Sequence, residues 1–152
     1  PLLFAQSQFG RQSRDMPEPA ELSYAQCREL IGSGVLGRVA FADDHGIAVL
    51  PVNYSIVNEA IVFRTSAYST LARLPAHETK GAAASFQVDH VDYDTKTGWS
   101  VLARGATEVI DVDDELAHIK RTWDPEPWAS GPRPIYIRLR FKELSGRRLT
   151  AH

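Results

Sequence analysis

The sequence predicts a mainly β (α+β) protein in which about six antiparallel strands form a closed or partly closed barrel, with two or three helices at its periphery. Three observations lead to this prediction. Apolar stretches of strand length recur along the chain, short polar turns join most of them, and the helical stretches fall between groups of strands. Tight turns between successive strands favour an antiparallel barrel, whereas a parallel sheet needs regular strand–helix alternation.

The chain has the size and composition of one folded domain. It contains 152 residues, of which 43% are hydrophobic and 24% charged, which is enough to build a sizeable core. Residues 1–20 lack periodicity, and Pro17 and Pro19 oppose a helix there. We therefore expect a flexible N-terminal arm over 1–20 and a barrel domain over 21–152.

The first predicted helix begins at Ser23. Gln26 lies three residues later, as in a capping box, and Leu22 and Cys27 occupy the positions of a hydrophobic staple. Cys27, Leu30 and Ile31 share one helical face, and the glycines at 32 and 34 end the helix. Cys27, the only cysteine, is thus interpreted as a core residue rather than a nucleophile.

Three strands are expected next, over 36–43, 47–57 and 60–65. The turns are Asp44–Gly46 and Asn58–Glu59, so the three strands form a meander. Pro51 has no N–H to donate to a neighbouring strand, which predicts a sheet edge or a bulge at that position.

The second half alternates helices and strands irregularly. Ser66 is expected to cap a short helix over 66–74, ended by Pro75, and Gly105 is a candidate bulge. Asp111 or Asp113 begins a longer helix whose apolar stripe is Val112, Leu116, Ile119 and Trp123. The remaining expected elements are strands over 82–92 and 99–111, a proline-rich loop over 124–134, and final strands over 134–144 and 146–150.

Composition argues against several classes of function. Lys and Arg number 17 against 19 Asp and Glu, so the net charge of −2 gives no support for nucleic-acid binding. No apolar run approaches the roughly 20 residues that cross a bilayer, and a single cysteine fits a reducing compartment. The five histidines show no paired ligand spacing, so no metal site is predicted. We expect a cytoplasmic protein without a membrane partner.

Several ordered motifs resemble one known family. They are GRVAFADDHGIAVLPVNYSIVNEAIVFRT (37–65), FQVDHVDYDTKTGWSVLARGATEVID (86–111), PWASG (127–131) and LSGRR (144–148). Their order and spacing are similar to those of the pyridoxamine 5'-phosphate oxidase-like split-barrel proteins, especially the actinobacterial and nitroimidazole-resistance branch. The resemblance implies a six-stranded antiparallel split β-barrel that forms a homodimer and holds a flavin, FMN by expectation, between its subunits.

The resemblance also implies where the cofactor lies. The flavin ring is expected near Pro51, Val52, Asn53, Trp99 and Ser100. The flavin phosphate is expected near Arg64, Thr65, Ser66, Ser69 and Thr70. Thr70 stands where members of this family often carry a lysine, and this exchange removes a positive charge from the expected phosphate site.

The residue types suit these roles, and each also has a simpler structural explanation. A phosphate dianion needs several donors in one place, and a helix start adds free N–H groups, yet Ser66 can be only a helix cap. An isoalloxazine ring needs apolar faces and a few polar edge contacts, yet Val52 and Trp99 can be only core residues. Asn53 can be only an edge hydrogen-bonding residue, and Trp128 either covers the pocket or only fixes its loop.

The leading functional hypothesis is a flavin- or deazaflavin-dependent oxidoreductase with an unassigned small-molecule substrate. The cofactor would carry the redox chemistry, so no conspicuous acid–base residue is required and no catalytic residue is named. One alternative is a non-enzymatic ligand-binding module that has lost the cofactor, which the Thr70 exchange favours. Another is a haem-binding relative, with the axial ligand drawn from His45, His77, His90 or His118.

Overall fold

The computed structural model describes residues 18–73 and 81–151. Seven strands form one antiparallel sheet in the order β1-β7-β4-β3-β2-β5-β6, and β7 also pairs with β6, which closes the sheet on itself. The predicted mainly β architecture with two or three helices is confirmed, and the described residues add the short β1 to the six strands expected. The elements are β1 (Ala20–Glu21), α2 (Tyr24–Gly32), β2 (Leu36–Asp43), β3 (Gly46–Val57), β4 (Ala60–Thr65), α3 (Thr70–Arg73), β5 (Ala82–Asp92), β6 (Thr97–Ile110), α4 (Asp113–Trp123) and β7 (Ile135–Leu149).

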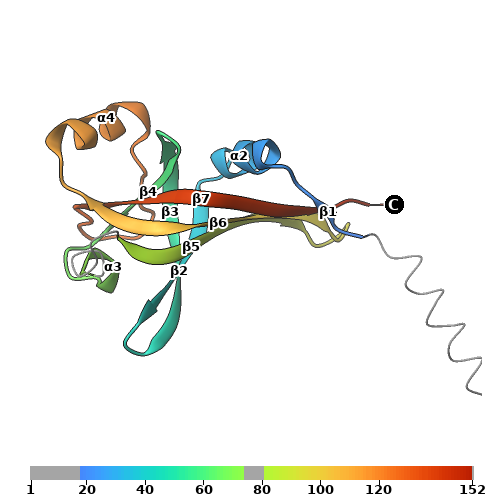
Figure 1. Ribbon diagram of the computed structural model, residues 1–152, viewed down its shortest axis with the longest axis horizontal. Coiled ribbons are helices and arrows are strands. Elements are labelled where there is room, and N and C mark those ends of the chain that lie inside the picture. Colours follow the sequence, from blue (N-terminus) through green and yellow to red (C-terminus); the bar gives the residue numbers. More distant parts are fainter. Residues whose placement is uncertain (1–17, 74–80, 152) are drawn as a thin grey trace, which may run out of the picture.

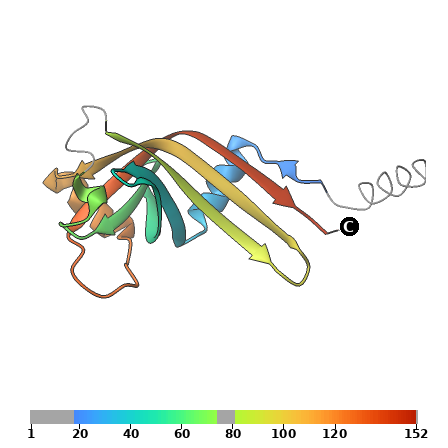
Figure 2. The same ribbon diagram turned by 90° about the horizontal axis from the view of Figure 1, so that it is seen from below.

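The molecule is elongated because β5, β6 and β7 extend well beyond the barrel. Helices α3 and α4 lie at the barrel end, and the β5–β6 turn and β1 lie at the other end of the long strands (Figure 1). The view from below shows the same division, with α2 alongside the extended strands (Figure 2). Functional residues on different strands can therefore lie at widely separated ends of one chain.

Helix α2 begins and packs as the sequence predicts. The Ser23 side chain accepts a hydrogen bond from the Gln26 N–H, and the Gln26 side chain accepts one from the Ser23 N–H. Cys27 and Ile31 are fully buried against the sheet. Burial raises the pKa of the Cys27 thiol, so it stays protonated and acts as a small core side chain.

Two hydrophobic clusters of the described residues stabilise the fold. The main cluster fills the barrel and includes Tyr54, Phe63 and Phe86, with the rings of Tyr54 and Phe86 5.0 Å apart in an edge-on arrangement. The second cluster lies between α4 and the sheet, where Ile119 packs with residues of β3, β4, β6 and β7. Leu116 and Trp123 join it as predicted, whereas Val112 is exposed at the cap of α4.

The final two predicted strands are one continuous strand. The break was expected at Ser145, with Gly146 beginning a separate strand, but both residues lie within β7, opposite Leu102 and Val101 of β6. A Cβ on Gly146 would lie 2.7 Å from the Ser100 carbonyl oxygen and 2.9 Å from the Cys27 sulfur. The glycine therefore permits close packing of α2 on the sheet. Ala20, the last residue of the predicted arm 1–20, belongs to β1, and residues 1–17 lie outside the described residues.

The helix predicted over 66–74 is shorter than expected. Within the described residues it begins at Thr70, after a turn in which the Ser69 N–H bonds to the Ser66 carbonyl. Ser69 rather than Ser66 caps it, because the Ser69 hydroxyl accepts a hydrogen bond from the Ala72 N–H. Leu74 and Pro75, the predicted end of this helix, lie outside the described residues.

Two predictions about irregular strand positions are confirmed. Pro51 pairs with Arg38 of β2, whereas the pairing of β3 with β4 begins only at Tyr54, so Pro51 lies on a local edge. The β6–β7 register shifts between Arg104 and Gly105, where the bulge was expected. Within 18–73 and 81–151, no helix combines the length and apolar character needed to span a bilayer.

Candidate functional site

Asn53 and Arg64 contact the same loop from neighbouring strands. The pairing of β3 with β4 runs from Val57 and Ala60 to Tyr54 and Phe63, so both residues lie just beyond its end. The structure therefore brings a predicted ring contact and a predicted phosphate contact to one loop, residues 124–134.

Both side chains hold the proline-rich loop 124–134. The Asn53 Oδ1 accepts a 2.8 Å hydrogen bond from the backbone N–H of Trp128, and the Asn53 Nδ2 donates to the Val35 carbonyl at 3.3 Å. Arg64 donates from Nε to the Arg133 carbonyl at 3.1 Å. The predicted cofactor contacts of Asn53 and Arg64 stay predictions, but their observed role is to fix this loop.

The first residue of the loop is also fixed. Asp124 accepts a 2.8 Å hydrogen bond from the Tyr136 hydroxyl and lies 3.8 Å from an Arg64 nitrogen. The Arg64 guanidinium lies over the Tyr136 ring, 4.9 Å from its centre. Burial and the hydrogen bond to Asp124 raise the pKa of Tyr136 to about 12, so its hydroxyl remains a donor at neutral pH.

The predicted phosphate cluster forms a compact turn after β4. Thr65 is buried, and its hydroxyl donates a 2.8 Å hydrogen bond to the Ser69 hydroxyl. Ser66 is half-buried in the same turn, and Thr70 is exposed at the start of α3. The structure thus brings Thr65, Ser66, Ser69 and Thr70 together, next to Arg64.

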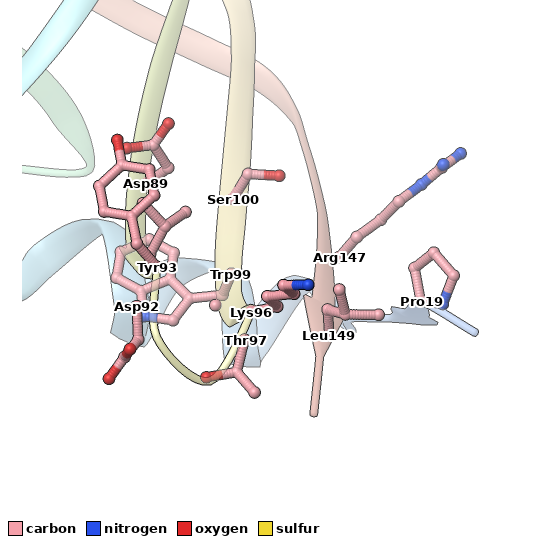
Figure 3. A pocket seen from close by; sticks show the side chains of 12 residues that line it. Pro19, Asp89, Asp92, Tyr93, Lys96, Thr97, Trp99, Ser100, Arg147 and Leu149 are labelled. Carbon is pink, nitrogen blue, oxygen red and sulfur yellow. The ribbon is translucent and has the colours of Figure 1, made fainter. Parts of the chain in front are cut away.

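Trp99 and Ser100 lie elsewhere, on the extended part of the sheet. They pair with Arg148 and Arg147 of β7, near its carboxyl end. Both line an open, mainly apolar pocket of about 450 Å³ (Figure 3). Successive residues point to opposite faces of a strand, and Trp99 also packs against the main core and lines a second pocket of about 420 Å³.

The predicted site residues join the closed sheet at different places. Thr65 pairs with Ile135 and Ser100 pairs with Arg147, so the turn after β4 and the Trp99–Ser100 pair join opposite ends of β7. On the other side of the sheet, Pro51 pairs with Arg38, Arg38 with Gln87, and Gln87 with Leu102, which is two residues from Ser100. The predicted set therefore divides into a barrel-end group (Arg64, Thr65, Ser66, Ser69, Thr70) and an extension group (Trp99, Ser100), with Pro51, Val52 and Asn53 of β3 between them.

Several residues of these groups were not singled out from the sequence. Tyr93, Lys96 and Arg147 line the extension pocket, and Figure 3 shows Arg147 projecting from β7 beside Leu149. The similarity of the LSGRR segment was the only signal for Arg147. Tyr136 and Asp124 were missed at the barrel end, because their hydrogen bond joins two ends of a loop and has no sequence pattern.

An exposed apolar surface follows the β2–β3 hairpin. Ile47 is 77% exposed and Val49 58% exposed, and both pair with residues of β2. Leu36 and Pro51 are exposed on the same strands. Contiguous exposed apolar residues of this kind mark interaction surfaces in soluble proteins.

The histidines of the described part show no common site. Within 18–73 and 81–151, no group of three His, Cys, Asp or Glu side chains is arranged to hold a metal ion. His45 lies in the β2–β3 turn, His90 on β5 and His118 on α4. His77 and His152 lie outside the described residues.

Comparison with known proteins connects this geometry to one family. The pyridoxamine 5'-phosphate oxidase family profile matches residues 23–148. An uncharacterised protein of Mycobacterium tuberculosis is 27% identical over 136 residues, covering 88% of both chains.

Two solved structures have the same fold. A Corynebacterium glutamicum protein presented as a candidate pyridoxamine 5'-phosphate oxidase superposes with a TM-score of 0.73 at 28% identity, covering 91% of this chain and 97% of that one. An FAD-binding protein from Mycobacterium smegmatis superposes with a TM-score of 0.68 at 24% identity, covering 86% and 99%, and supports the fold alone. The chain belongs to the pyridoxamine 5'-phosphate oxidase family of split-barrel proteins.

Proposed function

We propose that this protein is a flavin-dependent oxidoreductase that binds FMN at two equivalent sites between the subunits of a homodimer. One observation carries the proposal. The predicted phosphate residues after β4 and the predicted ring residues Trp99 and Ser100 join opposite ends of β7, at Ile135 and Arg147. This separation along one strand supports a shared site to which one subunit supplies the barrel-end group and its partner supplies the extension group.

The apolar β2–β3 surface supplies a reason for two copies to associate. A twofold axis makes each surface patch meet its own copy, and every contact then occurs twice. Burying Ile47 and Val49 in such an interface removes two strongly exposed side chains from water, each worth about 1.5–3 kcal/mol. The same axis can place the extension pocket of one subunit against the barrel end of its partner.

The donor chemistry of both groups fits a flavin. The extension pocket offers apolar walls and a volume of about 450 Å³, in the range of small-molecule sites. The barrel end offers the hydroxyls of Ser66, Ser69 and Thr70, and β3 offers the exposed flank of Pro51. When bound, the flavin supplies hydride or electron transfer, and this chain's residues bind its ring and its phosphate.

The experiment is a titration of the purified protein with FMN, riboflavin and a deazaflavin, followed by absorbance and by melting temperature. The proposal predicts micromolar or tighter binding of FMN, with the bound flavin eluting at twice the 16.9 kDa chain mass. A protein that binds none of the three compounds would refute it. Tighter binding of the deazaflavin than of FMN would support the proposed site but refute FMN as its cofactor.

A second candidate is a split-barrel module without a redox cofactor. Thr70 favours it, because the expected phosphate site lacks the lysine charge and the hydroxyls of Thr65 and Ser69 already bond to each other. Such a protein would be a colourless dimer whose melting temperature does not respond to any flavin.

A further inference from the structure

Trp128 is an exposed tryptophan on a stiff loop. Its side chain is 69% exposed, although an indole normally gains more from burial than almost any other side chain. Prolines at 125, 127, 132 and 134 restrict the loop backbone. A large aromatic group held out in this way is suited to stack on a flat partner.

The position of Trp128 is determined by its neighbours on the sheet. The Asn53 Oδ1 accepts a 2.8 Å hydrogen bond from the backbone N–H of Trp128, and the Asn53 Nδ2 donates to the Val35 carbonyl. Arg64, on the neighbouring strand β4, holds the far end of the loop through the Arg133 carbonyl at 3.1 Å. A predicted ring contact and a predicted phosphate contact therefore both fix the loop that carries Trp128.

The loop also lies at the barrel end of the molecule, where the predicted phosphate residues are. Both views place the segment between α4 and β7 at the barrel end, where α3 follows the Thr65–Ser69 turn (Figures 1 and 2). Asn53 directly follows Pro51 and Val52 on β3. An indole next to Asn53 is thus close to the strand expected to lie along the flavin ring.

We propose that Trp128 forms a wall of the flavin site by stacking on the isoalloxazine ring, and that Asn53 is the positioning residue that fixes it. This inference rests on the proposed function. It makes Trp128 a determinant of specificity for flat aromatic ligands, independent of the phosphate. It also explains both hydrogen bonds of Asn53: the bond to Val35 orients the amide, and the bond to the Trp128 backbone holds the loop.

The test compares Trp128→Leu and Trp128→Phe with the wild-type protein, using titrations with FMN and with riboflavin, which lacks the phosphate. Trp128→Leu should weaken binding of both compounds by the same factor, about tenfold, because the lost contact is with the ring they share. Trp128→Phe should retain most of the affinity. Tyr24→Leu, at an exposed aromatic residue of α2, is the matched control and should bind as the wild type does.

The positioning role of Asn53 has its own readout. Asn53→Ala should weaken riboflavin binding, but Asn53→Ala combined with Trp128→Leu should bind no more weakly than Trp128→Leu alone. Additive losses would show that Asn53 acts on the ligand independently of Trp128.

The outcomes separate the two proposals. A wild-type protein that binds no flavin refutes the proposed function. A wild-type protein that binds flavin as tightly as Trp128→Leu does refutes only the inference about Trp128. If Trp128→Leu instead dissociates the dimer, Trp128 contacts the partner subunit, and the stacking role is again overturned.

Discussion

Replacing Gly37 by alanine tests the packing that supports the strand next to the candidate site. Gly37 lies on β2 opposite Val52, and an added Cβ would lie 2.1 Å from Cε1 of Phe86 and 2.6 Å from its Cζ. Phe86 cannot easily move, because it is fully buried and packs against Tyr54 at 5.0 Å and Phe63 at 6.2 Å. The methyl group has no free space at this position.

Overpacking of a core by one methyl group costs about 1–3 kcal/mol. For a domain of this size, Gly37→Ala should therefore lower the melting temperature by about 2–12 °C. The assay is thermal unfolding followed by circular dichroism. Phe86→Leu should relieve part of the effect, so the double variant should be more stable than the sum of the single losses predicts.

Gly32→Ala is the matched control for this experiment. It makes the same chemical change at the end of α2, where only the flexible end of Arg28 lies within 3 Å. Alanine is favoured over glycine in a helix by about 1 kcal/mol, so this variant should be as stable as the wild type or more so. A Gly37→Ala protein that melts within 1 °C of the wild type would refute the packing described for β2.

Three further predictions concern charge and assembly. Glu108 accepts hydrogen bonds from Arg138 and Arg140, both at 2.8 Å. Burial raises the pKa of Glu108, but the two arginines outweigh burial and hold this pKa below the ordinary 4.5. The ionised Glu108 stabilises the fold fully above pH 4.5, and this stabilisation is lost as the pH falls through the lowered pKa. Glu108→Gln should therefore make the melting temperature fall less steeply in acid. The contribution to the free energy of unfolding is no more than about 1 kcal/mol, because these groups are half-exposed. Thr70→Lys should tighten FMN binding about tenfold and leave riboflavin binding unchanged, because it adds a charge-assisted contact to the phosphate alone; equal gains for both compounds in the titration would contradict this placement. Val49→Glu should give a monomer by light scattering, whereas Tyr24→Glu on α2 should stay a dimer; a dimeric Val49→Glu protein would move the interface elsewhere.

Local patterns predicted the fold where the signal lies within a few residues. The Ser23–Gln26 capping box, the bulge at Gly105 and the edge position of Pro51 each follow from the chemistry of one or two residues. The strand break expected at Ser145 was wrong, because a serine followed by a glycine is typical of a turn. Gly146 is required instead for close packing against Cys27 and Ser100, which are far away in sequence.

The candidate site was predicted less completely than the fold. Motif resemblance named residues on β3, β4 and β6, but it did not show that Ser100 and Thr65 pair with opposite ends of β7. That separation depends on the length and register of β7. The roles of Asn53 and Arg64 in holding the loop were also invisible, since hydrogen bonds to backbone groups of a distant loop carry no sequence signature.

Subunit complementation tests the central claim most directly. Thr70→Glu should repel the phosphate at the barrel end, and Ser100→Arg should obstruct the extension pocket, so neither homodimer should bind FMN. Co-refolding the two variants in equal amounts should produce mixed dimers with one intact site each, and restore about a quarter of the wild-type FMN capacity. A mixture of exchanged dimers that binds no FMN, or a single variant that still binds it fully, would contradict a site shared between two subunits.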